Sequence, residues 1–248
     1  IPRSPTGQVV GIADRIDTLV GIFAAGLKPT GNKDPFALRR AALGLLRILL
    51  EAGFDVPPRE VLMLAADSLG GTRTIDDALL DDLHAFVVER LRHHYGGQGF
   101  ATDLVNAALA SPWTTLPDLE RRLRSIDAFM DDPAARSLAA SNKRIGNILR
   151  KAAFEEKPEI DTNLFDFDEE KLLFEEVTRI DSAVQPLLAG GDYGASLRLL
   201  SGLEQPVNRF FDAVMVMDED AARRENRLAL LARLKGLFDR IADLSILG

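Results

Sequence analysis

The stretch Gly26–Gly44, GLKPTGNKDPFALRRAALG, joins a loop rich in glycine and proline to the start of an amphipathic helix. Asp34 is a good N-cap residue. Pro35 suits the first helical position, because the N–H group that proline lacks would have no partner inside the helix. At about 100° per residue, one face of the helix is apolar and Arg40 and Arg47 lie on the opposite face. The apolar face comprises Leu38, Ala42, Leu45, Leu46 and Leu49. We expect this face to pack and the other to be solvated.

Helix signals continue along the rest of the chain. Apolar residues recur at helical spacing between short runs of Gly, Pro and Ser, and alternating β-branched runs are missing. We therefore expect an all-α fold, a helical bundle. The predicted helices cover residues 8–25, 35–52, 58–69, 76–94, 100–110, 117–130, 133–156, 168–189, 192–201, 206–216 and 219–244. The pair Gly70-Gly71 predicts a domain boundary, with residues 1–70 in one domain and residues 71–248 in the other.

The bulk composition is that of an ordinary globular protein. The 248 residues are 46% hydrophobic, enough for one or two domains, and cysteine is absent, which excludes a disulfide framework. The absence of cysteine is also compatible with a reducing compartment, so we expect a cytoplasmic protein. No apolar run approaches the roughly 18 residues of a membrane span, so we expect it to be soluble. The first residue is Ile1 rather than Met, which predicts a piece of a longer chain. The net charge of −8 argues against a protein that coats nucleic acid indiscriminately, although it permits local clusters of cations.

One such cluster is predicted in the segment SNKRIGNILRKAAF, residues 141–154. In a helix its apolar residues share one face, while cations and an amide share the other. The candidate RNA-binding residues are Lys143, Arg144, Asn147, Arg150 and Lys151, with Arg144 at the border of the polar face. Cations can neutralise phosphates, and an amide can hydrogen-bond the base edges that single-stranded RNA exposes. The alternative is a merely solvated face.

Residues that could support catalysis or metal binding are few. His93 and His94 point about 100° apart on a helix, which suits surface positions better than a shared metal, and His84 stands apart from them. Asp14 and Asp17 share a helix face and could bind a metal or act as acid and base, but solvation is the alternative. No hydroxyl has a base placed to activate it. We therefore predict neither catalytic residues nor a metal site.

Two segments carry a resemblance to a known family. The segment GIADRIDTLVGIFAAGLKPTG, followed by DPFALRR, resembles the beta subunit of the bacterial two-subunit glycyl-tRNA synthetase. Further along, NKRIGNILRKA and VMVMDEDAARRENRLALLARLKGLFDRIADLSILG resemble the DALR-type helical anticodon-binding domain of arginyl-tRNA synthetases, and a similar tail closes the glycyl beta subunits. Together they cover nearly the whole chain, which we interpret as the C-terminal part of such a subunit.

This resemblance implies a function. The chain is expected to bind glycine tRNA on its anticodon side, as part of an aminoacyl-tRNA ligase of alpha2beta2 type. The alpha subunit is expected to use ATP and Mg²⁺, and no cofactor is expected in this chain. Residues 1–70 would be the remnant of an HD-type phosphohydrolase region in which Asp14 matches the last metal-ligating aspartate, but its upstream partners are absent. The alternatives are a helical protein-interaction scaffold and a metal phosphohydrolase remnant.

Arg227 is predicted to have a structural role despite lying in a motif that carries the resemblance. Helical geometry places it at the start of the apolar stripe of the last helix, so we expect it to be at least partly buried. A buried guanidinium needs carboxylates or carbonyls around it. The nearby candidates are Asp212, Asp218 and Asp220.

Overall fold

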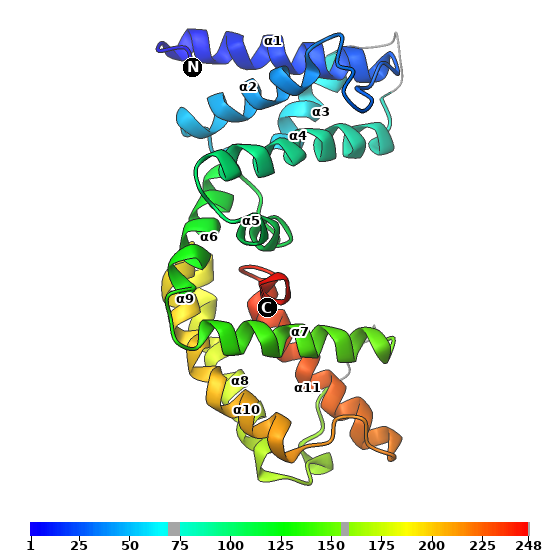
Figure 1. Ribbon diagram of the computed structural model, residues 1–248, viewed down its shortest axis with the longest axis vertical. Coiled ribbons are helices and arrows are strands. Elements are labelled where there is room, and N and C mark those ends of the chain that lie inside the picture. Colours follow the sequence, from blue (N-terminus) through cyan, green and yellow to red (C-terminus); the bar gives the residue numbers. More distant parts are fainter. Residues whose placement is uncertain (69–74, 155–158, 248) are drawn as a thin grey trace. The chain divides into compact units, whose positions relative to one another are not determined.

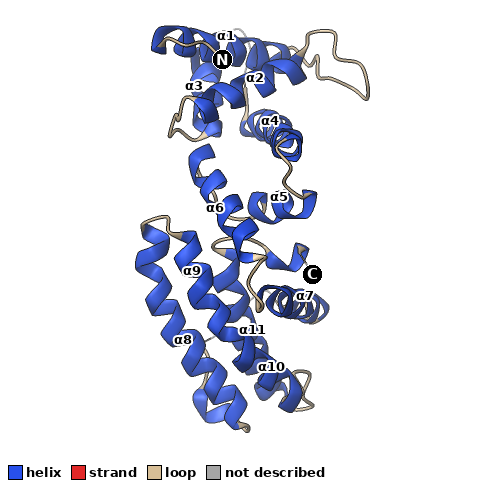
Figure 2. Cartoon of the chain, turned by 60° about the vertical axis from the view of Figure 1, so that its left-hand side comes forward, coloured by secondary structure: helices blue, strands red, loops and turns tan. Residues whose placement is uncertain are grey.

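The computed structural model describes residues 1–68, 75–154 and 159–247. In this part of the chain the regular elements are all helices, as Figure 2 shows, which confirms the predicted fold class. None of the helices in these ranges combines the length and the apolar character needed to cross a membrane.

The chain divides into two compact units. The first comprises Ile1–Thr102 and Trp113–Glu120, and the second comprises Asp103–Pro112 and Arg121–Gly248. The boundary that the glycine pair predicted near residue 70 falls outside the described residues. The assignment of residues 1–70 and 71–248 to two domains therefore stays a prediction.

Four helices build the core of the first unit, namely α1 (Pro5–Ala24), α2 (Leu38–Glu51), α3 (Pro58–Ser68) and α4 (Asp77–Gly97). Helix α1 packs along α2, and α4 packs against both α2 and α3 (Figure 1). The predicted apolar face of α2 is buried, since Leu38, Ala42, Leu45, Leu46 and Leu49 are each at most 1% exposed. Arg40 and Arg47 on the opposite face are exposed, and Arg47 donates to Glu51 one turn later.

The start of α2 differs from the prediction. The helix begins at Leu38, and Ala37 before it has a left-handed backbone with a φ of 55°. Residues 35–37 form a turn because the Asp34 carboxylate reaches past them and accepts from the N–H groups of Leu38 (2.8 Å) and Arg39 (3.0 Å). Asp34 therefore satisfies two of the first helical N–H groups, as a capping residue does, but from a position further upstream than the sequence indicated.

The second unit is a bundle built around α11 (Ala221–Asp239). From Asn226 to Ala232 every residue of α11 is buried, as expected for a helix that is covered on all sides. Helices α7 (Ala135–Lys151) and α8 (Asp168–Ala189) pack against α11, and α9 (Tyr193–Leu200) and α10 (Glu204–Ala213) pack against α8 (Figures 1 and 2). The remaining elements of the whole chain, in order, are α5 (Thr102–Leu109), α6 (Leu116–Phe129), η1 (Thr162–Leu164), η2 (Ser201–Leu203) and η3 (Leu244–Ile246). The first residues of α6, up to Glu120, belong to the first unit and the rest belong to the second.

Helix α7 ends in a conformation that glycine would adopt more easily. Ala153 has a φ of 47°, and Phe154 donates to the carbonyl of Leu149 at 3.0 Å, which closes the helix. Since the left-handed conformation is unfavourable for a residue with a Cβ, Ala153→Gly is expected to raise the free energy of unfolding by about 0.5–1 kcal/mol. Denaturant unfolding checks this. Ala152→Gly is the matched control, because Ala152 has an ordinary helical φ of −78° and its substitution should only destabilise. Equal effects of the two changes would contradict the expectation.

Candidate nucleic-acid interface

The five predicted site residues lie on one exposed side of α7. Lys143, Arg144, Asn147, Arg150 and Lys151 are all exposed. On the other side of the helix, Ile145 is fully buried and Leu138 is 1% exposed, so the apolar side of α7 is held by the bundle. The packing of that side against α11, η3 and α10 determines the direction in which the cations point. The result is an exposed polar face on a helix whose apolar side is packed.

Four of the five residues surround a common hollow of about 410 Å³. Lys143, Arg144, Asn147 and Lys151 line it, together with Ala140 and Ile148. Arg150 does not line this hollow and instead donates to the side-chain oxygen of Asn147. The structure therefore gathers three cations and an amide around one surface depression, and it places the fifth residue beside them.

An aromatic residue that was not among the candidate RNA-binding residues borders this face. The guanidinium carbon of Arg144 lies 4.0 Å from the centre of the Phe211 ring, which comes from α10. Phe210, next to it, is fully buried. Adjacent residues on a helix point about 100° apart, so burial of one phenylalanine leaves the other nearer the surface. That spacing was the available signal for Phe211.

Comparison with known proteins shows that two successive parts of the sequence match two family models. Residues 1–110 match the family model described as glycyl-tRNA synthetase beta subunit. Residues 138–248, which include α7 and α11, match the model of the DALR anticodon binding domain. The chain belongs to the glycyl-tRNA synthetase beta subunit family. The resemblance drawn from the sequence is thus confirmed.

Individual relatives in this family match along the whole chain. The proteins named glycine–tRNA ligase beta subunit from Acinetobacter baylyi, Ectopseudomonas mendocina and Pseudomonas fluorescens are 44%, 43% and 45% identical over 247, 248 and 253 residues. In each case the match covers 100% of this chain and 36% of the relative. The chain therefore spans just over a third of the length of these relatives. Which part of a beta subunit it represents stays a prediction.

Arg121, Arg122 and Arg124 form a second basic run in the sequence, and one of the three, Arg122, has a structural role. Arg122 is only 7% exposed, and it donates to the carbonyls of Arg240 and Ile241 in the segment that follows α11. Its guanidinium also lies 4.3 Å from the centre of the Tyr193 ring. Arg122 therefore joins three parts of the bundle. Sequence spacing alone could not distinguish it from its exposed neighbours Arg121 and Arg124.

Arg227 occupies the position in the DALR-matching region that its helical direction predicted. Its side chain is 1% exposed, and Nε donates to Glu170 at 2.8 Å. Its Nη1 group donates to the carbonyl of Met215 at 3.0 Å and to Asp218 at 2.5 Å. The predicted burial and the Asp218 contact are confirmed. Burial lowers the pKa of Arg227, but the bonds to Glu170 and Asp218 outweigh it and hold that pKa above its usual value.

The other two acids suggested for Arg227 were wrong. Asp220 is the N-cap of α11 and accepts from the N–H group of Arg223 at 3.1 Å. Asp212 is exposed on α10 and lines a hollow beside α7. Their carboxylates are therefore used elsewhere, and Glu170 from α8 supplies the buried charge. The fully buried Glu170 could not be found from local sequence, because it lies far from Arg227 along the chain.

The candidate metal-binding residues of this family member do not form a cluster. Asp14 and Asp17 are both exposed on α1. Across the ranges that the structure describes, no group of three or more His, Asp and Glu side chains is placed to hold a metal ion. His84 is partly buried rather than fully at the surface. Burial, together with the positive charge of Arg59, lowers its pKa.

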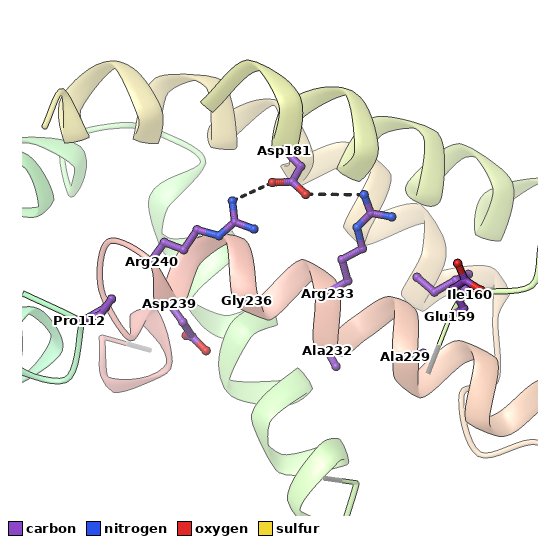
Figure 3. Close-up of a pocket in the computed structure, with 10 residues that line it drawn as sticks. All are labelled: Pro112, Glu159, Ile160, Asp181, Ala229, Ala232, Arg233, Gly236, Asp239 and Arg240. Atoms are coloured by element: carbon purple, nitrogen blue, oxygen red, sulfur yellow. Dashed lines mark hydrogen bonds and ion pairs between the residues drawn. The ribbon is translucent and has the colours of Figure 1, made fainter. Parts of the chain in front are cut away.

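Another hollow, with a volume of about 640 Å³, lies along α8 and α11, and Figure 3 shows the residues that line it. Asp181 stands between two arginines there, 2.7 Å from Arg240 and 3.6 Å from Arg233. Glu159 and Asp239 also line it. Its charges are mixed and its arginines are paired with an acid, so it is less suited to phosphate than the cationic face of α7.

Proposed function

We propose that this chain binds the anticodon side of glycine tRNA and thereby supports glycylation by a two-subunit ligase. The observation that carries the proposal is the exposed cationic face of α7, which lies inside the region that matches the anticodon-binding model. The relatives are named as glycine–tRNA ligase beta subunits, and these names are the basis for proposing glycine as the amino acid and tRNA ligation as the reaction.

Charge distribution supports this proposal. The chain as a whole carries a net charge of −8, so most of its surface should repel RNA. Along α7 the exposed Lys143, Arg144, Arg150 and Lys151 concentrate positive charge on one side of a helix. Phosphates would therefore be drawn to this face, and the acidic surroundings would disfavour binding elsewhere. Localised attraction of this kind suits a specific RNA contact better than indiscriminate coating.

Within the face, the residues have different proposed tasks. Lys143, Arg144, Arg150 and Lys151 would contact phosphates, which position the RNA without reading its sequence. Asn147 would read a base edge. Because its side-chain oxygen already accepts from Arg150, that reading would use the amide N–H groups as donors.

The chemistry of the reaction is proposed to lie outside this chain. Glycine activation with ATP and Mg²⁺ would belong to the alpha subunit of a cytoplasmic alpha2beta2 assembly, and none of the residues discussed is proposed to act as a catalyst. The contribution of the chain would be binding energy. Interactions remote from the reacting atoms can raise kcat/KM when they help to place the acceptor end of the tRNA.

The proposal predicts salt-dependent tRNA binding. Each phosphate contact contributes about 0.7–0.9 to the slope of log affinity against log salt concentration, so Lys151→Ala should flatten that slope by roughly this amount. Filter binding or fluorescence anisotropy with glycine tRNA over a salt series measures it. Lys171→Ala is the control, because Lys171 is an exposed lysine on α8 outside the proposed interface. A slope that Lys151→Ala leaves unchanged would count against the α7 interface.

The rival functions predict different results. A helical scaffold that binds only proteins would show no salt-sensitive affinity for tRNA. A metal phosphohydrolase remnant based on Asp14 would require a bound divalent ion or phosphatase turnover. Asp14 is exposed and belongs to no cluster of possible metal ligands in the described part of the chain, so this alternative is not favoured.

A further inference from the structure

The exposed apolar side chains of the second unit gather at one of its ends. Among the described residues of this unit, the large apolar side chains that are exposed are Phe167, Met215 and Met217. Phe167 precedes α8, and the two methionines lie in the segment that joins α10 to α11, at the same end of the bundle (Figures 1 and 2). We call these three side chains the methionine tip. Single exposed apolar residues are common on soluble proteins, whereas a group of them is typical of a contact surface.

The backbone of residues 214–217 turns both methionines outward. Val214 has an extended backbone, with a φ of −108° and a ψ of 121°. Successive side chains point to opposite sides of an extended backbone. Val214 and Val216 are accordingly 5% and 6% exposed, whereas Met215 and Met217 are 75% and 52% exposed. The valines therefore fix the segment to the bundle, and the methionines point to solvent.

Arg227 brings the two parts of the methionine tip together. Its guanidinium carbon lies 5.6 Å from the centre of the Phe167 ring. Its Nη1 group donates to the carbonyl of Met215 at 3.0 Å and to Asp218 at 2.5 Å. Because Arg227 is itself only 1% exposed, these contacts join the tip to the core of the bundle. A buried side chain thus holds the start of α8 and the α10–α11 segment next to each other.

Acidic residues accompany this apolar surface. The segments 166–169 and 218–220 contain six acids and no cation. The six are Asp166, Asp168, Glu169, Asp218, Glu219 and Asp220. Two arginines nearby are engaged with these segments, since Arg223 is paired with Asp166 and Arg224 donates to the carbonyl of Asp218 at 2.8 Å. The methionine tip therefore combines apolar side chains with a negative potential.

This potential decides which class of partner the tip suits. The acids repel the phosphates of RNA and of an anionic membrane surface. A second copy of the chain would bring the same six acids to the contact, because a two-fold interface pairs a surface with itself. A protein that carries cations beside its apolar side chains is attracted instead. The flexible thioether of methionine can adapt to apolar side chains of different shapes.

We infer that the methionine tip binds a basic amphipathic helix of a partner protein. The apolar face of such a helix packs on Phe167, Met215 and Met217, and its lysines or arginines reach the acids around them. The inference does not depend on the proposed function, because RNA takes no part in this contact. It gives the second unit a protein contact in addition to the contact with tRNA proposed for α7.

The test uses the assembled ligase and a fluorescent synthetic peptide of leucine and lysine, in which the leucines form one face of a helix. The parent should bind this peptide with a dissociation constant of about 1–10 μM in fluorescence anisotropy. A peptide of the same composition with scattered leucines, and one with glutamate in place of lysine, should bind at least about ten-fold more weakly. A parent ligase that does not bind the helical peptide, or that binds the scattered one equally well, overturns the inference.

Substitution of the methionines locates the binding. Met215→Gln combined with Met217→Gln keeps the length of both side chains but makes them polar, so it should weaken peptide binding by about ten-fold or more. Val10→Gln combined with Leu64→Gln is the matched control and should bind as the parent does, because it removes two exposed apolar side chains from the first unit. Equal affinities of the parent and the methionine variant contradict the inference. Thermal unfolding checks that both variants are folded.

Substitution of the acids gives an independent result. Asp168→Asn combined with Glu219→Gln removes two exposed charges and leaves the apolar side chains in place. It should weaken peptide binding by about five-fold at low salt, and the difference should diminish as salt is raised. This variant decides the outcome if the methionine variant is unfolded, and an unchanged affinity then overturns the inference.

Affinity for glycine tRNA distinguishes this contact from the proposed function. Both tip variants should bind glycine tRNA as the parent does, whereas Lys151→Ala should change the salt slope of tRNA binding and leave peptide binding unchanged. A folded methionine variant with weakened tRNA binding would show that the tip contacts RNA, and the inference would be wrong. Failure of Lys151→Ala to alter tRNA binding would count against the α7 interface alone.

Discussion

Replacing Arg227 with alanine is expected to lower the free energy of unfolding by about 3–5 kcal/mol. The reason is the buried carboxylate that the substitution leaves behind. Glu170 is fully buried and receives the Nε bond of Arg227 at 2.8 Å. Removal of the guanidinium also takes away the bonds to Asp218 and to the Met215 carbonyl, which hold the segment between α10 and α11.

Part of Glu170 would stay satisfied, which limits the expected loss. Its Oε2 atom accepts from the backbone N–H groups of Asp166 (2.9 Å) and Phe167 (3.1 Å) at the start of α8. These bonds maintain the helix start when Arg227 is absent, but they do not neutralise the charge. The penalty is therefore that of an unpaired buried carboxylate rather than of a lost cap.

Denaturant unfolding of the parent and of Arg227→Ala measures the difference. Arg223→Ala is a matched control, because Arg223 lies one turn earlier on α11 and forms an ion pair with Asp166 while its side chain is 43% exposed. An exposed pair of this kind is worth about 1 kcal/mol or less. A stable Arg227→Ala protein that had lost tRNA binding would show that Arg227 contacts RNA instead of maintaining the fold.

Removing Lys143 and Lys151 together should weaken tRNA binding roughly 25-fold at about 0.1 M salt. With a slope near 0.7 for each phosphate contacted on single-stranded RNA, one contact contributes about five-fold at this salt concentration, and two contacts multiply. Both lysines are exposed and line the same hollow, so the fold should be unaffected. The loss should shrink as salt is raised, because releasing each counterion into a more concentrated salt solution is less favourable.

The control for this double variant has the same change in net charge. Lys33→Ala combined with Arg40→Ala removes two exposed cations from the first unit, outside the region that matches the anticodon-binding model. Affinities of both double variants for glycine tRNA, measured at two salt concentrations, decide the outcome. Equal losses would mean that net charge rather than the α7 face governs binding.

Local patterns in the sequence were sufficient to predict which segments form helices and which face of a helix is buried. The apolar positions of α2 follow the helical period, and all five predicted ones are buried. The same reasoning placed Arg227 inside the bundle and the five candidate residues of α7 on its surface. These predictions succeed because the period of a helix is fixed by its backbone geometry, so a face can be read without knowing what covers it.

Only the tertiary structure decided which residues meet. The sequence offered acids close to Arg227, whereas the buried partner Glu170 comes from another helix, and Asp212 lines a hollow beside α7. Arg122 and Arg144 both lie in basic helical segments, yet Arg122 is buried against carbonyls whereas Arg144 is exposed beside the Phe211 ring. Contacts between residues distant in the chain depend on how whole helices pack. Helical periodicity determines the direction in which a side chain points, and the packing of other helices determines what it meets there.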